Sequence, residues 1–285
     1  MTTRTAFLFI LAVGSTVILT GARSGSPTPS SISAETIFIS QPLPLEADII
    51  GLGIDATELL QKALAKLGQN QTEWMKTKIR QTVLGVDTNF VAEGFLQRGP
   101  NQCARLEMNI GKLGYLQIVS DGEVIAQVRN TPGKAPEIVV EHFPNIALPG
   151  LSAAENNSDA KEAFLNGRSC GGPKALLQHL CQHLRKGKLQ TGMFQGRAVI
   201  QVKGELEPAA MATCAVTTTP VRYAVVYLDA KTLWAGRLEW WGRDKIEAPH
   251  PLVRIEFLEP KFDQPLSAQA CMRMFSYRPT DESAP

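Results

Sequence analysis

Apolar residues along this chain recur with two different periods, and the change between them divides the sequence into its expected elements. From residue 55 onward they lie at the spacing of one helical face, at Leu60, Ala63, Leu64 and Leu67. Asp55 followed by Glu58 is a capping-box pattern, which is typical of a helix start, and Gly68 is the expected stop. The spacing therefore predicts an amphipathic helix that ends near Leu67.

Residues 74–129 alternate between apolar and polar positions with a period of two, which is typical of strands. The expected strands lie near Trp74–Leu84, Phe90–Arg98, Cys103–Ile110, Tyr115–Ser120 and Glu123–Arg129. The Asp121-Gly122 pair is the strongest hairpin signal in the chain. Consecutive strands without an intervening helix must pair antiparallel, because parallel neighbours need a long crossover. This stretch therefore predicts a meander.

A second helix is expected over residues 173–186, after a stretch rich in Pro, Gly and Asn. Pro173 suits the first helical turn, and Gly187 follows as a stop signal. The helix would carry one apolar stripe made of Leu176, Leu177, Leu180, Cys181 and Leu184. Further strands are expected near Phe194–Lys203, Val221–Leu228, Leu233–Trp241, Leu252–Phe257 and Cys271–Tyr277.

These elements predict a mainly β fold of the α+β class. About ten antiparallel strands in one sheet would curl strongly. A curved half-barrel whose concave face is covered by the two amphipathic helices accommodates both the curl and the apolar stripes. The Trp240-Trp241 pair on one strand would place one indole on each face of the sheet.

The N-terminus carries the features of a signal peptide. Arg4 precedes the apolar run Ala6–Leu19, and the small residues Thr20-Gly21-Ala22 follow it. We therefore expect a signal peptide over residues 1–22, cleaved near Ala22, with an uncleaved membrane anchor as the alternative. A Pro- and Ser-rich linker is expected over residues 23–50, and a single domain over residues 51–285. No Cys lies near the cleavage point, so the lipid anchor of a bacterial lipoprotein is excluded.

Export to the periplasm or the medium narrows the possible functions. An exported protein meets an oxidising environment without a nucleotide pool, which argues against ATP chemistry. The net charge of +2 is close to neutral and argues against nucleic acid as the main partner. The 285 residues, 44% of them hydrophobic, can bury a large core. The five cysteines form no CxxC motif, and their odd number leaves the disulfide pairing open.

Residues that could carry chemistry are few. His179 and His183 have the i, i+4 spacing of metal ligands on a helix, but the sequence HLCQH lacks the Glu of HExxH and has no evident third ligand. We therefore expect both histidines to be exposed and solvated, and a metal protein or hydrolase built on them is an alternative. The chain has no GxSxG motif and no P-loop. No catalytic residue, metal ion or cofactor is expected.

Several short motifs, taken in their order, resemble those of the periplasmic lipoprotein-carrier superfamily with the LolA/LolB-like fold. They are Phe95–Asn101, similar to a strand ending in Arg-Pro-Asn; Ser120-Asp121-Gly122, similar to an SDG hairpin; Tyr227–Thr232 with Arg237-Leu238-Glu239, similar to an LDPKTGLP…RIE hairpin; and Phe275–Pro279, similar to a terminal F-x-Y-x-P. The resemblance covers roughly residues 55–279. Gly99 is an insertion, the strand at Val124–Val128 lacks the usual Trp and Tyr, and residues 150–190 differ from the family pattern.

The resemblance implies a non-enzymatic carrier or sensor that holds an acylated or lipidic ligand in a cavity between the curved sheet and its lid helices. The expected ligand-binding residues at the cavity and lid are Arg98, Leu96, Leu176, Leu177, Leu180 and Leu184. In the family an arginine at the position of Arg98 tethers the lid by hydrogen bonds to helix carbonyls. The expected partners are a lipid or an acylated lipoprotein, and a membrane-associated donor or acceptor protein is also open. The alternative is a scaffold or interaction protein of the same fold with a packed interior.

Overall fold

The computed structural model of the chain describes residues 6–8, 17–19, 39–40, 55–70, 75–84, 90–143, 161–166, 170–208, 221–242, 250–262 and 267–276. Near the N-terminus β1 (Ala6–Leu8) pairs antiparallel with β2 (Val17–Leu19). The rest of the expected signal segment and nearly all of the expected linker lie outside the described residues. Cleavage and the domain boundaries therefore stay predictions.

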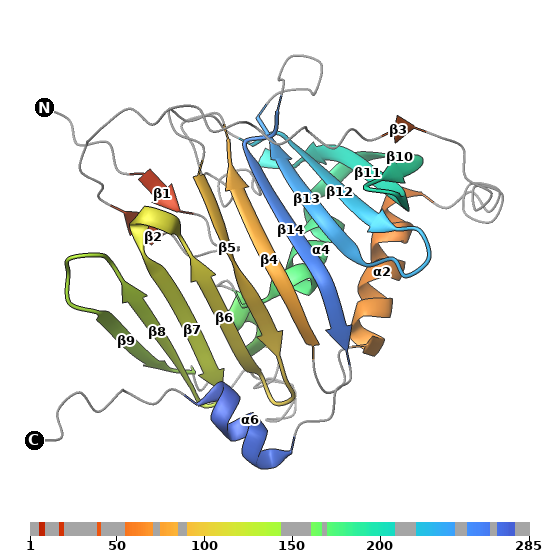
Figure 1. Ribbon diagram of the computed structural model, residues 1–285. Coiled ribbons are helices and arrows are strands. Elements are labelled where there is room, and N and C mark those ends of the chain that lie inside the picture. The colour runs from red at the N-terminus through yellow and green to blue at the C-terminus, as the bar shows by residue number, and fades with distance from the viewer. Residues whose placement is uncertain are drawn as a thin grey trace, which may run out of the picture.

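A curved, unclosed antiparallel sheet is the centre of the fold (Figure 1). Within the described residues it has twelve strands, counting the two-residue β3, in the order β3-β10-β11-β12-β13-β14-β4-β5-β6-β7-β8-β9. Their bounds are β3 (Ile39–Ser40), β4 (Met75–Val83), β5 (Phe90–Arg98), β6 (Cys103–Asn109), β7 (Tyr115–Asp121), β8 (Val124–Asn130), β9 (Glu137–His142), β10 (Leu184–Phe194), β11 (Arg197–Leu206), β12 (Tyr223–Asp229), β13 (Ala235–Trp241) and β14 (Val253–Phe262). The expected half-barrel architecture is confirmed.

Two meanders make up this sheet, and one long-range strand pair joins them. Strands β4 to β9 follow one another along the chain, as do β10 to β14. The join is the pairing of β14 with β4, which places Val253 opposite Val83 and Phe257 opposite Ile79. The expected antiparallel meander over residues 74–129 is confirmed by the pairing of β4 through β8.

The β7–β8 turn shows why the sequence Ser120-Asp121-Gly122 is needed there. The Asp121 carboxylate accepts hydrogen bonds from the backbone N–H groups of Glu123 and Val124, both at 2.9 Å. Gly122 has a φ of 94°, and a Cβ at that position would lie 2.2 Å from the carbonyl oxygen of Asn101. Only glycine combines this backbone conformation with so close an approach to the neighbouring turn.

Two helices cover the concave face of the sheet, α2 (Ala56–Asn70) and α4 (Gly172–His183) (Figure 1). The expected cap of α2 is present, because the Asp55 carboxylate accepts the Glu58 N–H at 2.8 Å. Helix α4 begins directly on the sheet, since a Cβ on Gly172 would lie 2.4 Å from a methyl group of Leu96 on β5. The apolar stripes of both helices join the sheet in one buried core.

The structure corrects the expected ends of both helices. Helix α2 continues through Gly68 to Asn70. Gly68 does not have the positive φ of a helix-ending glycine, and a Cβ there would meet nothing within 4 Å. Helix α4 ends at His183, so Leu184 belongs to β10 instead of the helical stripe. Leu184 is nevertheless buried, and a Cβ on Gly204 of the paired strand would lie 2.7 Å from its side chain.

The expected strand at Cys271–Tyr277 is wrong over its described part. This segment forms helix α6 (Ala268–Phe275), whose N-cap Ser267 accepts the Ala270 N–H at 3.1 Å. Cys271, Met274 and Phe275 are spaced i, i+3 and i+4, which is also a helical pattern, and so short an apolar run does not distinguish strand from helix. Strands β9 and β10 had no expected counterpart over most of their length.

The convex face of the sheet is polar over β4, mixed over β5, where Val91 and Phe95 are exposed, and carries a second, smaller apolar cluster over β10 to β13. Ion pairs such as Lys78 with Glu259 at 2.7 Å and Arg80 with Glu93 at 2.8 Å join neighbouring strands there. The two indoles lie on opposite faces as expected, because Trp240 packs in the concave core and Trp241 in the convex cluster. Among the described segments, none of the helices has the length and apolar character of a membrane span.

Replacing Leu180 by Asp should destabilise the fold by several kcal/mol, because Leu180 is fully buried between α4 and the sheet and an unpaired carboxylate cannot be solvated there. Gln182→Asp is the matched control, since Gln182 is exposed on the same helix. Urea denaturation of both variants measures the difference. Equal midpoints for Leu180→Asp and wild type would show that the stripe is not buried.

Candidate functional site

The residues expected to bind a ligand meet in the interior between α4 and the concave face. Leu96 comes from β5, Leu184 from β10, and the other three leucines from α4; they are Leu96, Leu176, Leu177, Leu180 and Leu184. All five are buried in the same core cluster. Their convergence makes this interior the candidate site, and binding of a ligand there stays a prediction.

Arg98 lies at the edge of this interior and connects the sheet to the start of α4. It is the last residue of β5, on the same side of the strand as Leu96. Its guanidinium donates to the Cys170 carbonyl oxygen at 2.9 Å and to the Glu162 carboxylate at 2.7 Å. Cys170 comes just before α4, so this arginine holds the first turn of the helix against the strand end.

Glu162 completes the connection and could not be identified from the sequence. It lies in the helical residues 161–166, and its second carboxylate oxygen is 3.7 Å from the Lys174 ammonium on α4. The side chains of Arg98 and Glu162 are 13% and 18% exposed, so their ion pair is shielded from solvent. A charge-assisted hydrogen bond in such a setting is stronger than one at the surface. Because residues 64 apart form the pair, no local sequence pattern predicts it.

Gln81 is a polar side chain inside the concave core. It lies on β4 and is fully buried, and neither its amide oxygen nor its amide nitrogen has a hydrogen-bond partner among the described residues. Thr77, four residues away on the same face, is satisfied, because its hydroxyl donates to the Leu258 carbonyl oxygen at 2.9 Å. A buried amide without a partner costs about 1–3 kcal/mol. The alternation of β4 already places Gln81 on the apolar face, which is the sequence signal that could have identified it.

The two histidines of α4 differ from the expectation that both are solvated. His179 is buried, with its ring centroid 4.8 Å from that of His183 and 6.1 Å from that of Trp240. Burial and, second, the neighbouring His183 lower the pKa of His179 to about 4. His179 lies only about 60° from Leu176 around the helix. Because the helix lies flat on the sheet, residues beside the apolar stripe, such as His179, are buried together with it.

His183 is half-buried and is paired at the end of α4. Its Nδ1 lies 3.2 Å from the Glu207 carboxylate, which also contacts the Arg185 guanidinium at 2.5 Å. Among the described residues, no group of three or more His, Cys, Asp and Glu side chains is arranged to hold a metal ion.

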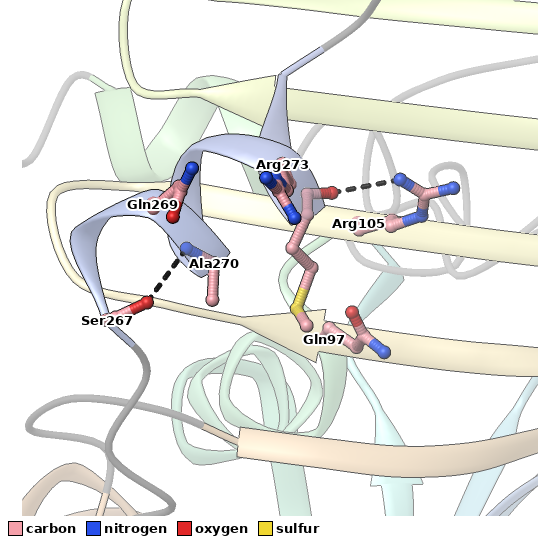
Figure 2. A pocket seen from close by; sticks show the side chains of 7 residues that line it. Gln97, Arg105, Ser267, Gln269, Ala270 and Arg273 are labelled. Atoms are coloured by element: carbon pink, nitrogen blue, oxygen red, sulfur yellow. Dashed lines mark hydrogen bonds between the residues drawn. The ribbon is translucent and has the colours of Figure 1, made fainter.

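Two cavities lie on the convex side of the sheet. One has a volume of about 450 Å³ and lies between α6 and strands β5 and β6 (Figure 2). Figure 2 shows Arg105 beside α6, where its guanidinium donates to the Met274 carbonyl oxygen at 2.9 Å. The lining is Gln97, Arg105, Ser267, Gln269, Ala270, Arg273 and Met274. Five of these seven lining residues are polar or charged.

The second convex cavity, of about 590 Å³, lies over β11 to β14 beside the buried Arg237. The Arg237 guanidinium carbon lies 4.8 Å from the Phe194 ring centroid and 5.3 Å from that of Tyr227. The same guanidinium donates to the Glu239 carboxylate, which also accepts the Trp241 indole N–H at 3.1 Å. These partners neutralise the arginine inside the convex cluster and give it a structural role.

Comparison with known proteins adds solved structures of similar fold. No protein-family model matches the chain, and no curated protein matches it. The chain is similar to the Mycobacterium tuberculosis lipoprotein LppX, with 12% identity over 73% of this chain and 98% of that chain and a TM-score of 0.38. A LolA superfamily protein from Nitrosomonas europaea has 7% identity over 79% of this chain and 98% of that chain, with a TM-score of 0.30.

The Pseudomonas aeruginosa MucA/MucB complex is a further similar structure. Its identity is 12% and its TM-score 0.35, and the match covers 76% of this chain and 60% of that chain.

Replacing Arg98 should loosen α4 without unfolding the sheet, because Arg98→Leu leaves the Cys170 carbonyl and Glu162 without their donor. We expect a loss of about 1–3 kcal/mol in α4 protection for Arg98→Leu, with a smaller loss for Arg98→Lys, whose ammonium lacks the planar fork. Hydrogen exchange of residues 172–183 measures it. Arg80→Leu is the control, since Arg80 pairs with Glu93 on the convex face. Unchanged exchange in both Arg98 variants would contradict the tether.

Lowering the pH should destabilise the protein through His179. An unfolded His takes up its proton near pH 6.5, whereas the pKa of His179 in the fold is about 4. Between these values the unfolded chain binds more protons, so stability falls as the pH decreases from about 6.5 to about 4. His179→Gln should reduce this slope in urea denaturation, and His142→Gln, at an exposed site, should not. The same slope in His179→Gln and wild type would contradict the assignment.

Proposed function

We propose that this protein is an exported, non-enzymatic carrier or sensor that binds an acylated or otherwise lipidic ligand between α4 and the concave face of the sheet. The observation that carries the proposal is the combination found there: a mainly apolar lining and the buried amide of Gln81, which has no hydrogen-bond partner among the described residues. Lipids with acyl chains present the same combination, because a long apolar chain ends in an ester or amide group.

A ligand in this interior would have its chain surrounded by the leucines of α4 and β5. The Gln81 amide has a donor and an acceptor, so it could bind the polar group of the ligand in either sense. Entry requires α4 to move away from the sheet, and the Arg98 hydrogen bonds to Cys170 and Glu162 are the contacts that would have to open first. Arg98 thus would act as a latch at the entrance, while the leucines provide affinity.

The chemistry of the described residues supports binding over catalysis. Burial raises the pKa of the Cys170 thiol to about 12 and that of Cys103, together with the nearby Asp121 carboxylate, to about 11. Thiols with such pKa values are almost fully protonated at neutral pH and are poor nucleophiles. His183, the more accessible histidine of the pair, is held by Glu207. These groups form no nucleophile and base pair.

The N-terminal sequence is the basis for proposing export, and export in turn supports a partner outside the cytoplasm. Arg4 and the apolar run Ala6–Leu19 predict secretion across a membrane. A carrier in that compartment takes its cargo from one site and delivers it to another, so we include a membrane-associated donor or acceptor protein among the proposed partners.

A scaffold or interaction protein with a packed interior is the second candidate. It is favoured by the dense packing of the concave core and by the position of the two cavities described above, which lie on the convex side. In this case the buried Gln81 amide would lower the free energy of unfolding without any compensating contact. Replacing it with an apolar side chain would then stabilise the protein and affect no ligand.

Substitution of Gln81 therefore separates the two functions. Wild type, Gln81→Leu and the convex-face control Gln97→Leu are purified without detergent, and each is extracted under denaturing conditions for lipid mass spectrometry. A carrier should yield bound lipid from wild type and Gln97→Leu, and at least about tenfold less from Gln81→Leu. A packed scaffold should yield no lipid from any of them, and Gln81→Leu should raise the melting temperature. The second pattern would overturn the carrier proposal.

A further inference from the structure

The C-terminal helix α6 packs on the convex side of the sheet, opposite to α2 and α4, and few contacts hold it there. Figure 1 shows α6 beside the lower ends of β6 and β7. Phe275 is buried, and Arg105 on β6 donates to the Met274 carbonyl at the last turn. Met274 is half-buried, and Met272 is 63% exposed. Such a helix is held mainly at its C-terminal end.

Cys103 lies at the point where α6 meets the sheet. It is the first residue of β6, two residues before Arg105 and therefore on the same side of the strand. A Cβ on Gly99 would lie 2.9 Å from the Phe275 ring and 3.3 Å from the Cys103 Cβ, so the ring and the cysteine converge on the same glycine. Gly99, an insertion relative to the family motif, provides the space in which they meet.

Cys271 lies on the same face of α6 as Phe275, because the two are four residues apart. The helix therefore presents Cys271 one turn away from the Phe275 ring, which lies beside Gly99 together with Cys103. The electrostatic influence of Cys271 on the Cys103 thiol agrees with this proximity. Both thiols are free and partly accessible in the structure.

We propose that Cys103 and Cys271 are the two halves of a disulfide that fixes α6 to β6. The reaction is thiol–disulfide exchange with a small or protein disulfide as the oxidant. One protein thiolate attacks the donor's S–S bond, forms a mixed disulfide and releases the first donor thiol, and the second protein thiolate then displaces the other donor thiol. The two protein thiols lose two protons and two electrons, which appear in the two thiols of the reduced donor. The inference holds whether or not the interior binds a lipid.

The other described cysteines are placed where they cannot compete. Cys170 is fully buried at the start of α4, and Cys181 lies on α4 itself, so both are on the concave side. The Cys103 thiol donates only a weak hydrogen bond, to the Asp121 carbonyl at 3.5 Å, which oxidation would remove at little cost. The new bond would tie the N-terminal part of α6 as firmly as Phe275 ties its end, and would fix the helical wall of the 450 Å³ cavity.

Peptide mapping of the oxidised protein tests the pairing. The full chain is reduced, freed of reductant, incubated with oxidised glutathione, blocked with N-ethylmaleimide and digested with trypsin without reductant. We expect residues 99–105 and 262–273 to appear as one linked pair, 2 Da lighter than the sum of the two peptides, because each contains one of the two cysteines. Cys181→Ser should keep the linked pair, and Cys271→Ser should abolish it.

Two outcomes of the peptide mapping would overturn the proposal. One is complete alkylation of Cys103 and Cys271 after oxidation is exhaustive, and the other is a link from either of them to Cys214 or to any third cysteine. Hydrogen exchange gives a second readout that needs no variant. Exchange in residues 268–275 should slow by at least about tenfold on oxidation of wild type, with α4 unchanged. Equal hydrogen exchange of residues 268–275 before and after oxidation would also contradict the proposed disulfide.

Discussion

The pairing of β14 with β4 is the contact on which the rest of the architecture depends. It connects residues that lie far apart in the chain, such as Phe257 opposite Ile79, and joins two meanders that would each be a smaller sheet. Only the joined sheet is wide enough to curl into a half-barrel. The concave face that results is what the stripes of α2 and α4 cover, so the interior exists because this one strand pair forms.

The interior combines extensive burial of apolar side chains with two polar residues, Arg98 and Gln81, that an apolar core alone would not need. Burial of the α4 leucines stabilises the closed arrangement, at roughly 1.5–3 kcal/mol for each fully buried side chain. Arg98 then fixes the first turn of α4 through directional bonds, while Gln81 stays buried without a partner. A structure selected only for packing would replace both with apolar residues, which is why we propose roles for Arg98 in ligand entry and for Gln81 in ligand contact.

The two faces of the sheet use charge differently. On the convex face, pairs such as Arg80 with Glu93 are exposed and add little stability, but they keep that face wetted. The buried Arg237 and Glu239 pair is instead enclosed by aromatic rings and donors, which compensate its desolvation. On the concave side the shielded Arg98 and Glu162 pair lies at the rim, where opening of the lid would return both charges to water.

Local patterns in the sequence determined most elements of this protein, and long-range contacts decided how the site is built. The capping pattern at Asp55, the alternation of β4 to β8 and the glycine of the β7–β8 turn each act within a few residues, so their physical causes can be read along the chain. The burial of His179, the partnership of Arg98 with Glu162 and the helical state of residues 268–275 depend on which surface each segment packs against. Those surfaces are formed by residues far away in the sequence, and only the tertiary structure brings them together.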